Sequence, residues 1–250
     1  MDSWLKAALD YIPGWLEYQI RLVDQPGCVI AVAHKGRIIL EQAFGVADIS
    51  TGKALTPRHR FRVASHSKTF TSAAIFKLRQ DGRLRLDDPA GRYVDGLHPV
   101  VAEATIFQLL SHSAGLIRDG VDAGQWQDRR PFLGEKELRA ALKEPPVIEA
   151  GTRLKYSNHG FGLLGLIIEA VTGEPYCDWV RREIIAAAKL GETEPDASVA
   201  RGTAVANGHS SKLPLGRRVV VPGDNRTLAL APATGFVSTA GDLARFFARL

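Results

Sequence analysis

The sequence is poor in cysteine and has no long apolar run, and each shortage excludes a class of protein. Its two cysteines, Cys28 and Cys177, do not make a disulfide framework. Both lie in apolar stretches, so we expect two buried thiols. The longest apolar runs are about ten residues, whereas a membrane-spanning helix needs roughly twenty. We therefore expect neither a disulfide scaffold nor a membrane span.

A targeting signal is also missing from the N-terminus. Residues 1–6 have no basic start, and no continuous apolar stretch follows them. We therefore expect a cytoplasmic protein, provided that no leader has been removed. The composition, with 45% hydrophobic and 24% charged residues, is that of an ordinary globular protein. The chain of 250 residues is long enough to bury a sizeable core.

Charge and histidine spacing argue against two further classes. The formal net charge is only +5, and the arginines are scattered, with no basic helix and no interleaving of basic and aromatic residues. The seven histidines never occur as His-x-x-x-His, and no Cys-x-x-Cys is present. We therefore expect no nucleic-acid partner, no metal and no cofactor.

A β-hairpin is the clearest secondary-structure signal in the chain. Residues 28–34 and 37–44 are apolar and strand-like, and Lys35-Gly36 between them favours a tight turn. Residues 4–23 have a helical pattern, which we expect Pro13-Gly14 to break or kink. The N-terminal part is therefore predicted to be a helix followed by a hairpin.

The rest of the chain is predicted to be mainly helical. Helical texture extends from about 67 to 190, with loops at 81–100 and 113–133 and the strongest later helices at 135–143, 159–173 and 177–189. Residues 191–232 are rich in Gly, Pro and Asn, with one β-like run at 218–221, and a capped helix follows from 239.

These patterns divide the chain into three stretches of one interleaved unit. Residues 1–60 hold the first helix and the hairpin, 61–215 are mainly helical, and 216–250 return towards the sheet. A hairpin alone is at best marginally stable in water. Because few further strand candidates remain, we expect the chain to stop before the sheet is complete.

A nucleophile is suggested by the pattern Ser-x-x-Lys, which occurs three times. A serine hydroxyl needs a positioned base, and residues three apart on a helix lie on one face. Ser3/Lys6 opens an amphipathic helix, where Ser3 is expected to cap and Lys6 to face solvent. Ser50/Lys53 lies in a turn-rich stretch. Neither of these two pairs is expected to be catalytic.

Ser65/Lys68 differs because a helix of mostly small and apolar residues follows it and ends near Gly82. Burial would lower the pKa of the Lys68 amine by disfavouring its charged form. In the first turn, Ser65 would also lie near the positive end of the helix dipole. Ser65 is therefore a candidate nucleophile and Lys68 a candidate base. The alternative is a structural role for both.

Tyr156-Ser157-Asn158 supplies the second set of polar groups. It follows a loop and precedes an apolar helix, so its side chains can project into a cleft. The phenol of Tyr156 could relay a proton to a leaving group, and Asn158 could orient Lys68 or bind a substrate amide. The alternative is that Tyr156 packs in the core and Asn158 caps the helix.

Ser111-His112-Ser113-Ala114-Gly115 nearly matches the nucleophile elbow Gly-x-Ser-x-Gly of α/β-hydrolases. Residues 106–110 could be the strand before it, and Asp196 and His209 follow in the right order. Two features count against this interpretation. Position 111 is Ser where the sharp turn needs Gly, and the residues after it, 118–124, cannot form the packed helix that an elbow requires.

Five segments in order carry a likeness to a known family: 61–71 with Ser65 and Lys68, 86–89, 109–116, 156–165, and 235–243. Through them the chain resembles the serine β-lactamases and penicillin-binding proteins. The likeness is greatest to their class C branch, which also holds D-aminopeptidases, D-Ala-D-Ala carboxypeptidases, esterases and amide-oligomer hydrolases. The resemblance implies a mixed α/β fold of the α+β type, with an antiparallel sheet flanked by helices and a mainly helical subdomain.

The resemblance also implies roles for individual residues. Ser65 would attack an acyl carbon, Lys68 and Tyr156 would exchange protons, and Asn158 would position the acyl side chain and Lys68. The backbone N–H of Ser65 would donate one half of an oxyanion hole. The family's third motif, Lys or His followed by Ser/Thr and Gly, is not found, since His209-Ser210-Ser211 lacks the Gly and comes too early. In the family the strand with this motif follows the helix on which the sequence ends, so the resemblance implies that these residues are the N-terminal part of a longer enzyme.

The sequence therefore predicts a serine hydrolase that acts through an acyl-enzyme on a small-molecule ester, amide, D-peptide or β-lactam. The alternative is a penicillin-binding or sensor protein that acylates without turnover, or an inactive relative without the third motif.

Overall fold

The N-terminal helix follows the sequence prediction except at Pro13. The computed structural model describes residues 3–120, 124–127, 129–196, 204–213, 216–221, 223 and 225–249. Helix α1 (Ser3–Leu22) runs through Pro13 without interruption, so the expected break at this position is wrong. Because proline fixes φ at about −65°, it can continue a helix at the loss of one hydrogen bond. Lys6 is exposed, as expected.

The predicted hairpin is confirmed. Strands β1 (Gly27–His34) and β2 (Arg37–Asp48) pair antiparallel, from Gly27 opposite Gly45 to His34 opposite Arg37. Lys35 and Gly36 have φ values of 48° and 73°, which is the left-handed geometry of a two-residue type I′ turn. The short strand β3 (Lys53–Ala54) pairs with the other edge of β2, so the strand order is β1-β2-β3.

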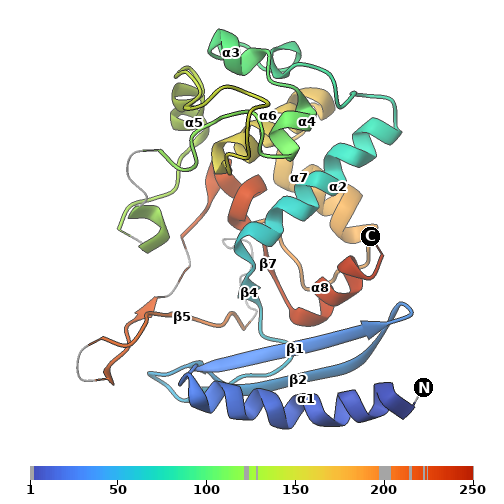
Figure 1. Cartoon of the computed structure of the whole chain (residues 1–250), viewed down its shortest axis with the longest axis vertical. Coiled ribbons are helices and arrows are strands. Elements are labelled where there is room, and N and C mark those ends of the chain that lie inside the picture. The colour runs from blue at the N-terminus through green and yellow to red at the C-terminus, as the bar shows by residue number, and fades with distance from the viewer. Residues whose placement is uncertain are drawn as a thin grey trace.

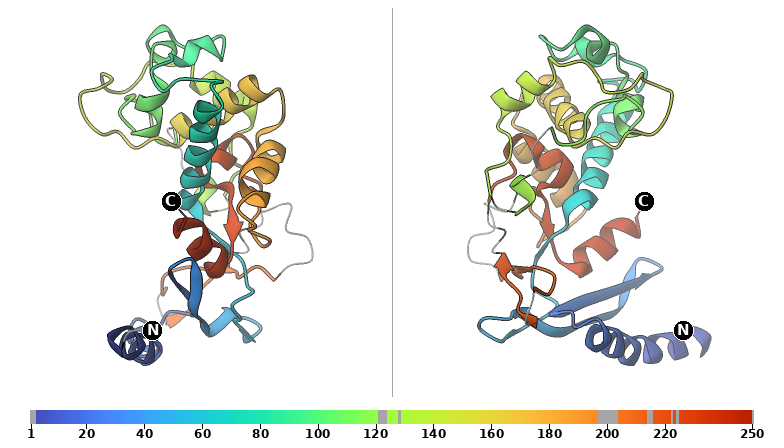
Figure 2. Two further views of the ribbon diagram at one scale, coloured as in Figure 1. Left: turned by 90° about the vertical axis from the view of Figure 1, so that its right-hand side faces the viewer. Right: turned by 60° about the vertical axis from the view of Figure 1, so that its left-hand side comes forward.

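The hairpin lies between two helices. Helix α1 runs along one side of it and α8 (Ala240–Phe247) along the other, as Figures 1 and 2 show. Beyond α8 lies a helical region built around α2 (Ser67–Gln80) and α6 (Asn158–Thr172). This is the mixed α/β fold that the resemblance implies, with an antiparallel sheet flanked by helices and a mainly helical part.

The remaining described elements are short. The helices are α3 (Pro99–Ala102), α4 (Ile106–Leu110), α5 (Glu135–Ala141) and α7 (Tyr176–Val180), with the 3-10 turns η1 (Ala64–His66), η2 (Ala90–Arg92), η3 (Gly124–Gln127) and η7 (Leu228–Leu230) and the π turns η4 (Arg181–Ala186) and η8 (Ala231–Gly235). Strand β4 (Phe61–Arg62) pairs with β7 (Val237–Ser238), and β5 (Gly208–His209) with β6 (Val220–Val221). The helices expected at 135–143 and 159–173 are confirmed, and the one expected at 177–189 is α7 continued by η4.

The core is centred on α2 and α6. Phe70 of α2 is fully buried, and its ring stacks between Phe236 at 4.5 Å and Phe246 at 4.2 Å, measured between ring centroids. The expectation of two buried thiols is wrong, since Cys28 and Cys177 are free and only partly buried. Burial raises the pKa of both thiols, that of Cys177 to about 12. Among the described residues, no helix is both long and apolar enough to cross a membrane.

Two glycines of α6 let neighbouring elements approach closely: η8 at Gly165, and α5 and η7 at Gly162. A Cβ at Gly165 would lie 2.4 Å from Cγ of Pro232, and one at Gly162 would lie 2.8 Å from Cδ2 of Leu138 and 3.2 Å from the carbonyl oxygen of Ala229. No side chain larger than hydrogen fits there without a shift of the neighbouring atoms. Gly165 therefore sets how close η8 lies to α6, and Gly162 sets how close α5 and η7 lie to it.

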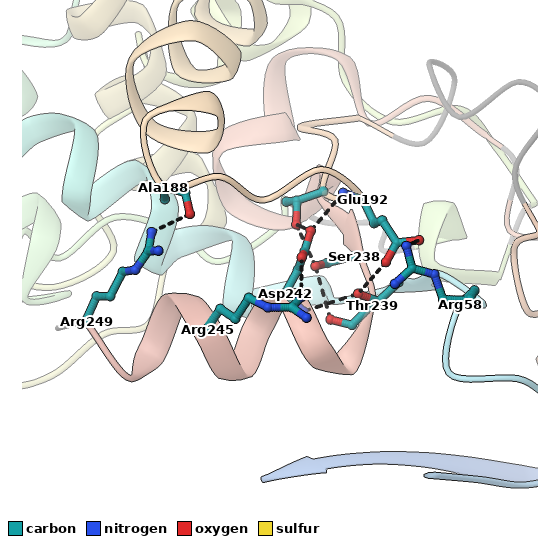
Figure 3. A network of polar contacts seen from close by, with 9 residues as sticks. Arg58, Ala188, Glu192, Ser238, Thr239, Asp242, Arg245 and Arg249 are labelled. Carbon is teal, nitrogen blue, oxygen red and sulfur yellow. Dashed lines mark hydrogen bonds and ion pairs between the residues drawn. The ribbon is translucent and has the colours of Figure 1, made fainter. Parts of the chain in front are cut away.

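A buried carboxylate anchors the start of α8, as Figure 3 shows. Asp242 is 2% exposed and accepts hydrogen bonds from the backbone N–H of Glu192 at 2.8 Å and the hydroxyl of Thr193 at 3.0 Å. Arg245 pairs with it at 3.0 Å. The hydroxyl of Thr239 caps the helix by accepting the N–H of Asp242. These bonds tie α8, which covers the hairpin, to the loop that follows η4.

We expect Asp242→Ala to lower the free energy of unfolding by about 3 kcal/mol, because it leaves buried donors without an acceptor. Urea denaturation followed by circular dichroism measures this. Asp81→Ala is the matched control: Asp81 pairs with Lys77 at the surface, and an exposed ion pair contributes at most about 1 kcal/mol. Equal losses in the two variants would contradict the anchoring role of Asp242.

Candidate active site

The candidate nucleophile lies on a strained turn just before α2. Ala64 has a left-handed φ of 45°, which is uncommon for a residue other than glycine. Ser65 follows Ala64 in η1, directly before the helix that carries Lys68, and its side chain is exposed. Ser67 braces the turn: its hydroxyl donates to the carbonyl of Ala64 at 2.6 Å and accepts the N–H of Phe236 at 3.0 Å. The side chain of Ser65 is therefore presented from a fixed backbone.

Tyr156 lies against Ser65 although 91 residues separate them. The Ser65 Oγ and the Tyr156 hydroxyl oxygen are 2.6 Å apart. Among the described residues, the hydroxyl of Ser65 forms its side-chain hydrogen bond with Tyr156 and none with Lys68. Tyr156 is half-buried, so its hydroxyl is at the site and is not packed in the core.

Ser157, and not Asn158, caps α6. The hydroxyl of Ser157 accepts the N–H of Gly160 at 2.9 Å and donates to the carbonyl of Ile117 at 2.6 Å. The side chain of Asn158 is 2% exposed and accepts a hydrogen bond from the Lys68 amine through Oδ1 at 2.7 Å. The capping alternative for Asn158 is therefore wrong.

The Lys68 amine is buried among neutral groups. Lys68 is 7% exposed, and its Nζ donates to Asn158 Oδ1 and to the carbonyl of Ala233 in η8, each at 2.7 Å. It lies 4.8 Å from the ring centroid of Tyr156 and 5.4 Å from that of Phe161. Burial lowers the pKa of Lys68 from 10.5 to about 7. At neutral pH the amine is therefore able both to take and to give a proton.

Asp119 is a residue of this site that sequence reasoning missed. It is 6% exposed and accepts a hydrogen bond from the Nδ2 of Asn158 at 2.5 Å. It also forms an ion pair with Arg118 at 2.9 Å. An ionised carboxylate only accepts, so it holds the amide with Nδ2 towards itself and Oδ1 towards Lys68. The charge of Asp119 raises the pKa of Lys68 and that of Arg118 lowers it, against the larger effect of burial. Asp119 lies in a stretch that the sequence pattern shows only as a loop.

The nucleophile-elbow interpretation is wrong. Residues 106–110 form helix α4 and not a strand, with Thr105 capping it. The Ser113 hydroxyl contacts that of Ser111 at 2.8 Å. The other two members of that set lie elsewhere: Asp196 accepts from Thr227, and the Nε2 of His209 accepts the N–H of Ile49 at 3.3 Å. His209 lies in β5, which pairs with β6, and among the described residues it forms no hydrogen bond with Ser113.

A cavity of about 270 Å³ begins beside the nucleophile. Ala64, next to Ser65, and Thr234, next to Ala233, form part of its wall. Three aromatic side chains line it further, those of Phe61, Trp126 and Phe132. The site therefore adjoins a largely apolar space that could hold a substituent next to an acyl carbon.

Comparison with known proteins identifies the fold and the family. The family described as Beta-lactamase matches residues 19–250. The esterase EstB of Burkholderia gladioli is 30% identical over 186 residues, which are 68% of this chain and 46% of the esterase.

Two solved structures are similar throughout the chain. A penicillin-binding protein homologue from Pyrococcus abyssi has a TM-score of 0.81 and 26% identity, over 94% of this chain and 54% of that one. A β-lactamase/D-alanine carboxypeptidase from Pseudomonas syringae has a TM-score of 0.80 and 26% identity, over 96% and 64%. The chain thus spans 46% to 64% of the length of these three proteins. It belongs to the β-lactamase family.

Proposed function

We propose that this protein is a serine hydrolase that forms an acyl-enzyme on Ser65, with Lys68 and Tyr156 as its proton-transfer partners. The observation that carries the proposal is the 2.6 Å contact between the Ser65 and Tyr156 oxygens, beside a buried amine whose pKa is about 7. A general base works best when its pKa is near the operating pH. Lys68 meets that condition, and its amine lies 4.8 Å from the centroid of the Tyr156 ring.

The proposed step conserves atoms and charge. The Oγ of Ser65 forms a bond to the acyl carbon while its proton moves to the oxygen of Tyr156, which passes a proton towards the Lys68 amine. When the bond to the leaving group breaks, the leaving group takes a proton back from this pair. Water then attacks the acyl carbon and gives a proton to the same pair. The bond between the acyl carbon and the Oγ of Ser65 breaks, Oγ takes a proton back from the pair, and the acid is released.

The substrate class that fits is a small ester, amide, D-peptide or β-lactam. The aromatic walls of the cavity favour an apolar acyl substituent. The esterase and carboxypeptidase named among the relatives support a carbonyl substrate of this kind. Asn158 is proposed to position Lys68, since its Oδ1 accepts from the amine while Asp119 holds its Nδ2. The second N–H of that amide is the group proposed to position the acyl side chain.

We expect Ser65→Ala to lower the turnover of a chromogenic short-chain ester by roughly 10⁴-fold, because the nucleophile is removed. Hydrolysis of p-nitrophenyl butyrate and labelling by a fluorescent β-lactam, followed by mass spectrometry, measure it. The control is Ser50→Ala, in the exposed Ser50/Lys53 pair, which should leave both signals unchanged.

The same experiment separates the competing functions. A burst followed by steady turnover indicates a hydrolase, whereas one stable adduct on Ser65 indicates a penicillin-binding or sensor protein. If the unmodified protein forms no adduct and shows no turnover, it is an inactive relative of the family, and the proposal is contradicted.

A pH dependence follows from Lys68. The amine must be neutral to take a proton, so kcat/KM should rise with pH through an inflection near 7, the pKa of Lys68. Asp119→Asn removes a charge that raises this pKa, so the inflection should move to lower pH. The asparagine can still accept from Asn158 through its own Oδ1. Rates for the ester between about pH 5 and 9, corrected for spontaneous hydrolysis, measure the shift.

The matched control for this prediction is Asp87→Asn. Asp87 also pairs with a neighbouring arginine, Arg85, but at the surface. Its removal should leave the inflection in place. An inflection that stays fixed in Asp119→Asn, or moves to higher pH, would show that Lys68 is not the group that titrates.

A further inference from the structure

His112 contacts the segment that carries Tyr156 on both sides of the tyrosine. Its carbonyl accepts the N–H of Lys155 at 2.7 Å, and its Nδ1 accepts the N–H of Ser157 at 3.2 Å. Lys155 and Ser157 are the two neighbours of Tyr156 in the chain. One residue thus fixes the backbone before and after the proposed proton relay.

The imidazole also covers the phenol ring. The two ring centroids are 4.3 Å apart with a 37° angle between the planes, and the imidazole lies 5.2 Å from the ring of Phe161. Burial, with a smaller contribution from the charge of Lys68, lowers the pKa of His112 to about 4. The ring is therefore neutral near pH 7, and its Nδ1 keeps the lone pair that Ser157 needs.

The backbone of His112 is shaped for this position. Its φ of 57° lies in the left-handed region, directly after Ser111, the C-cap of α4. This conformation turns the chain away from the helix and towards residues 155–158. Among residues with a side chain, Asn tolerates it best, and the Oδ1 of Asn would stand close to where the Nδ1 of His stands.

We propose that His112 is a positioning residue that holds the Tyr156 hydroxyl against Ser65. Its Nδ1 accepts from Ser157 and its ring packs on the phenol, so it acts through Tyr156. The inference rests on the proposed function, in which Tyr156 relays the proton. It adds that the arrangement of the relay depends on a side chain from the loop after α4.

The test is a mutant cycle with p-nitrophenyl butyrate. His112→Leu removes the acceptor and the ring, and should lower kcat by about 100-fold with little change in KM, because the relay is displaced. His112→Asn keeps the acceptor and the backbone conformation, and should lose about 10-fold at most. In a Tyr156→Phe background, His112→Leu should cost no more than about 2-fold, since the relay is already gone.

The matched control is His98→Leu. The Nδ1 of His98 accepts the N–H of Val100 at the start of α3, also at 3.2 Å, but distant from the relay. Its kcat should equal that of the unmodified protein. A full loss in the Tyr156→Phe background, an unchanged kcat in His112→Leu, or an equal loss in His112→Asn and His112→Leu would each overturn the proposal.

Crystal structures of the variants test the inference without reference to turnover. The 2.6 Å contact between Ser65 and Tyr156 should persist in the unmodified protein and in His112→Asn, and be lost in His112→Leu. Retention of the contact in His112→Leu would overturn the positioning role. If the unmodified protein neither turns over the ester nor forms an adduct, the proposed function fails, and this comparison still decides the role of His112.

Discussion

The site depends on one buried amine and the two neutral oxygens that hold it. Lys68 comes from α2, Asn158 from the start of α6, and the carbonyl of Ala233 from η8, so three segments distant in sequence meet at a single nitrogen. Each oxygen is itself fixed by packing or by another bond. Asp119 holds the amide of Asn158, and Gly165 of α6 sets how close η8 can come. A shift of α2, α6 or η8 would therefore change the distance between the Lys68 amine and its two acceptors.

The nucleophile is held by a separate set of contacts. Strand β4 pairs with β7 immediately before the strained Ala64, and Ser67 ties the turn to Phe236. A left-handed alanine costs about 1–2 kcal/mol and persists only where surrounding contacts enforce it. The aromatic stack of Phe70 with Phe236 and Phe246 supplies such contacts. The strain therefore lies next to the reacting oxygen and is supported by the core.

Local patterns predicted the elements that form from neighbouring residues. The hairpin follows from Lys35-Gly36 between two apolar runs, and α6 from a long apolar helix signal. The four candidate residues Ser65, Lys68, Tyr156 and Asn158 were found because each stands next to such an element. Burial of Lys68 could be anticipated from the apolar texture of α2.

Contacts between loops that are distant in the sequence could not be predicted from local patterns. Residues 112–118 run alongside 147–158 through bonds such as Gly151 to Ser113 and Asn158 to Arg118, and no periodicity reports that pairing. Asp119 and His112 derive their roles from it. The choice of cap shows the same limit: Ser157 and Asn158 are both good capping residues. The acceptor-only carboxylate of Asp119 and the amine of Lys68 engage both ends of the Asn158 amide, which leaves the cap to Ser157. The contacts of Asn158 with Asp119 and Lys68 thus decide which residue caps α6. The same contacts set the orientation of the Asn158 amide and place the charge of Asp119 near Lys68.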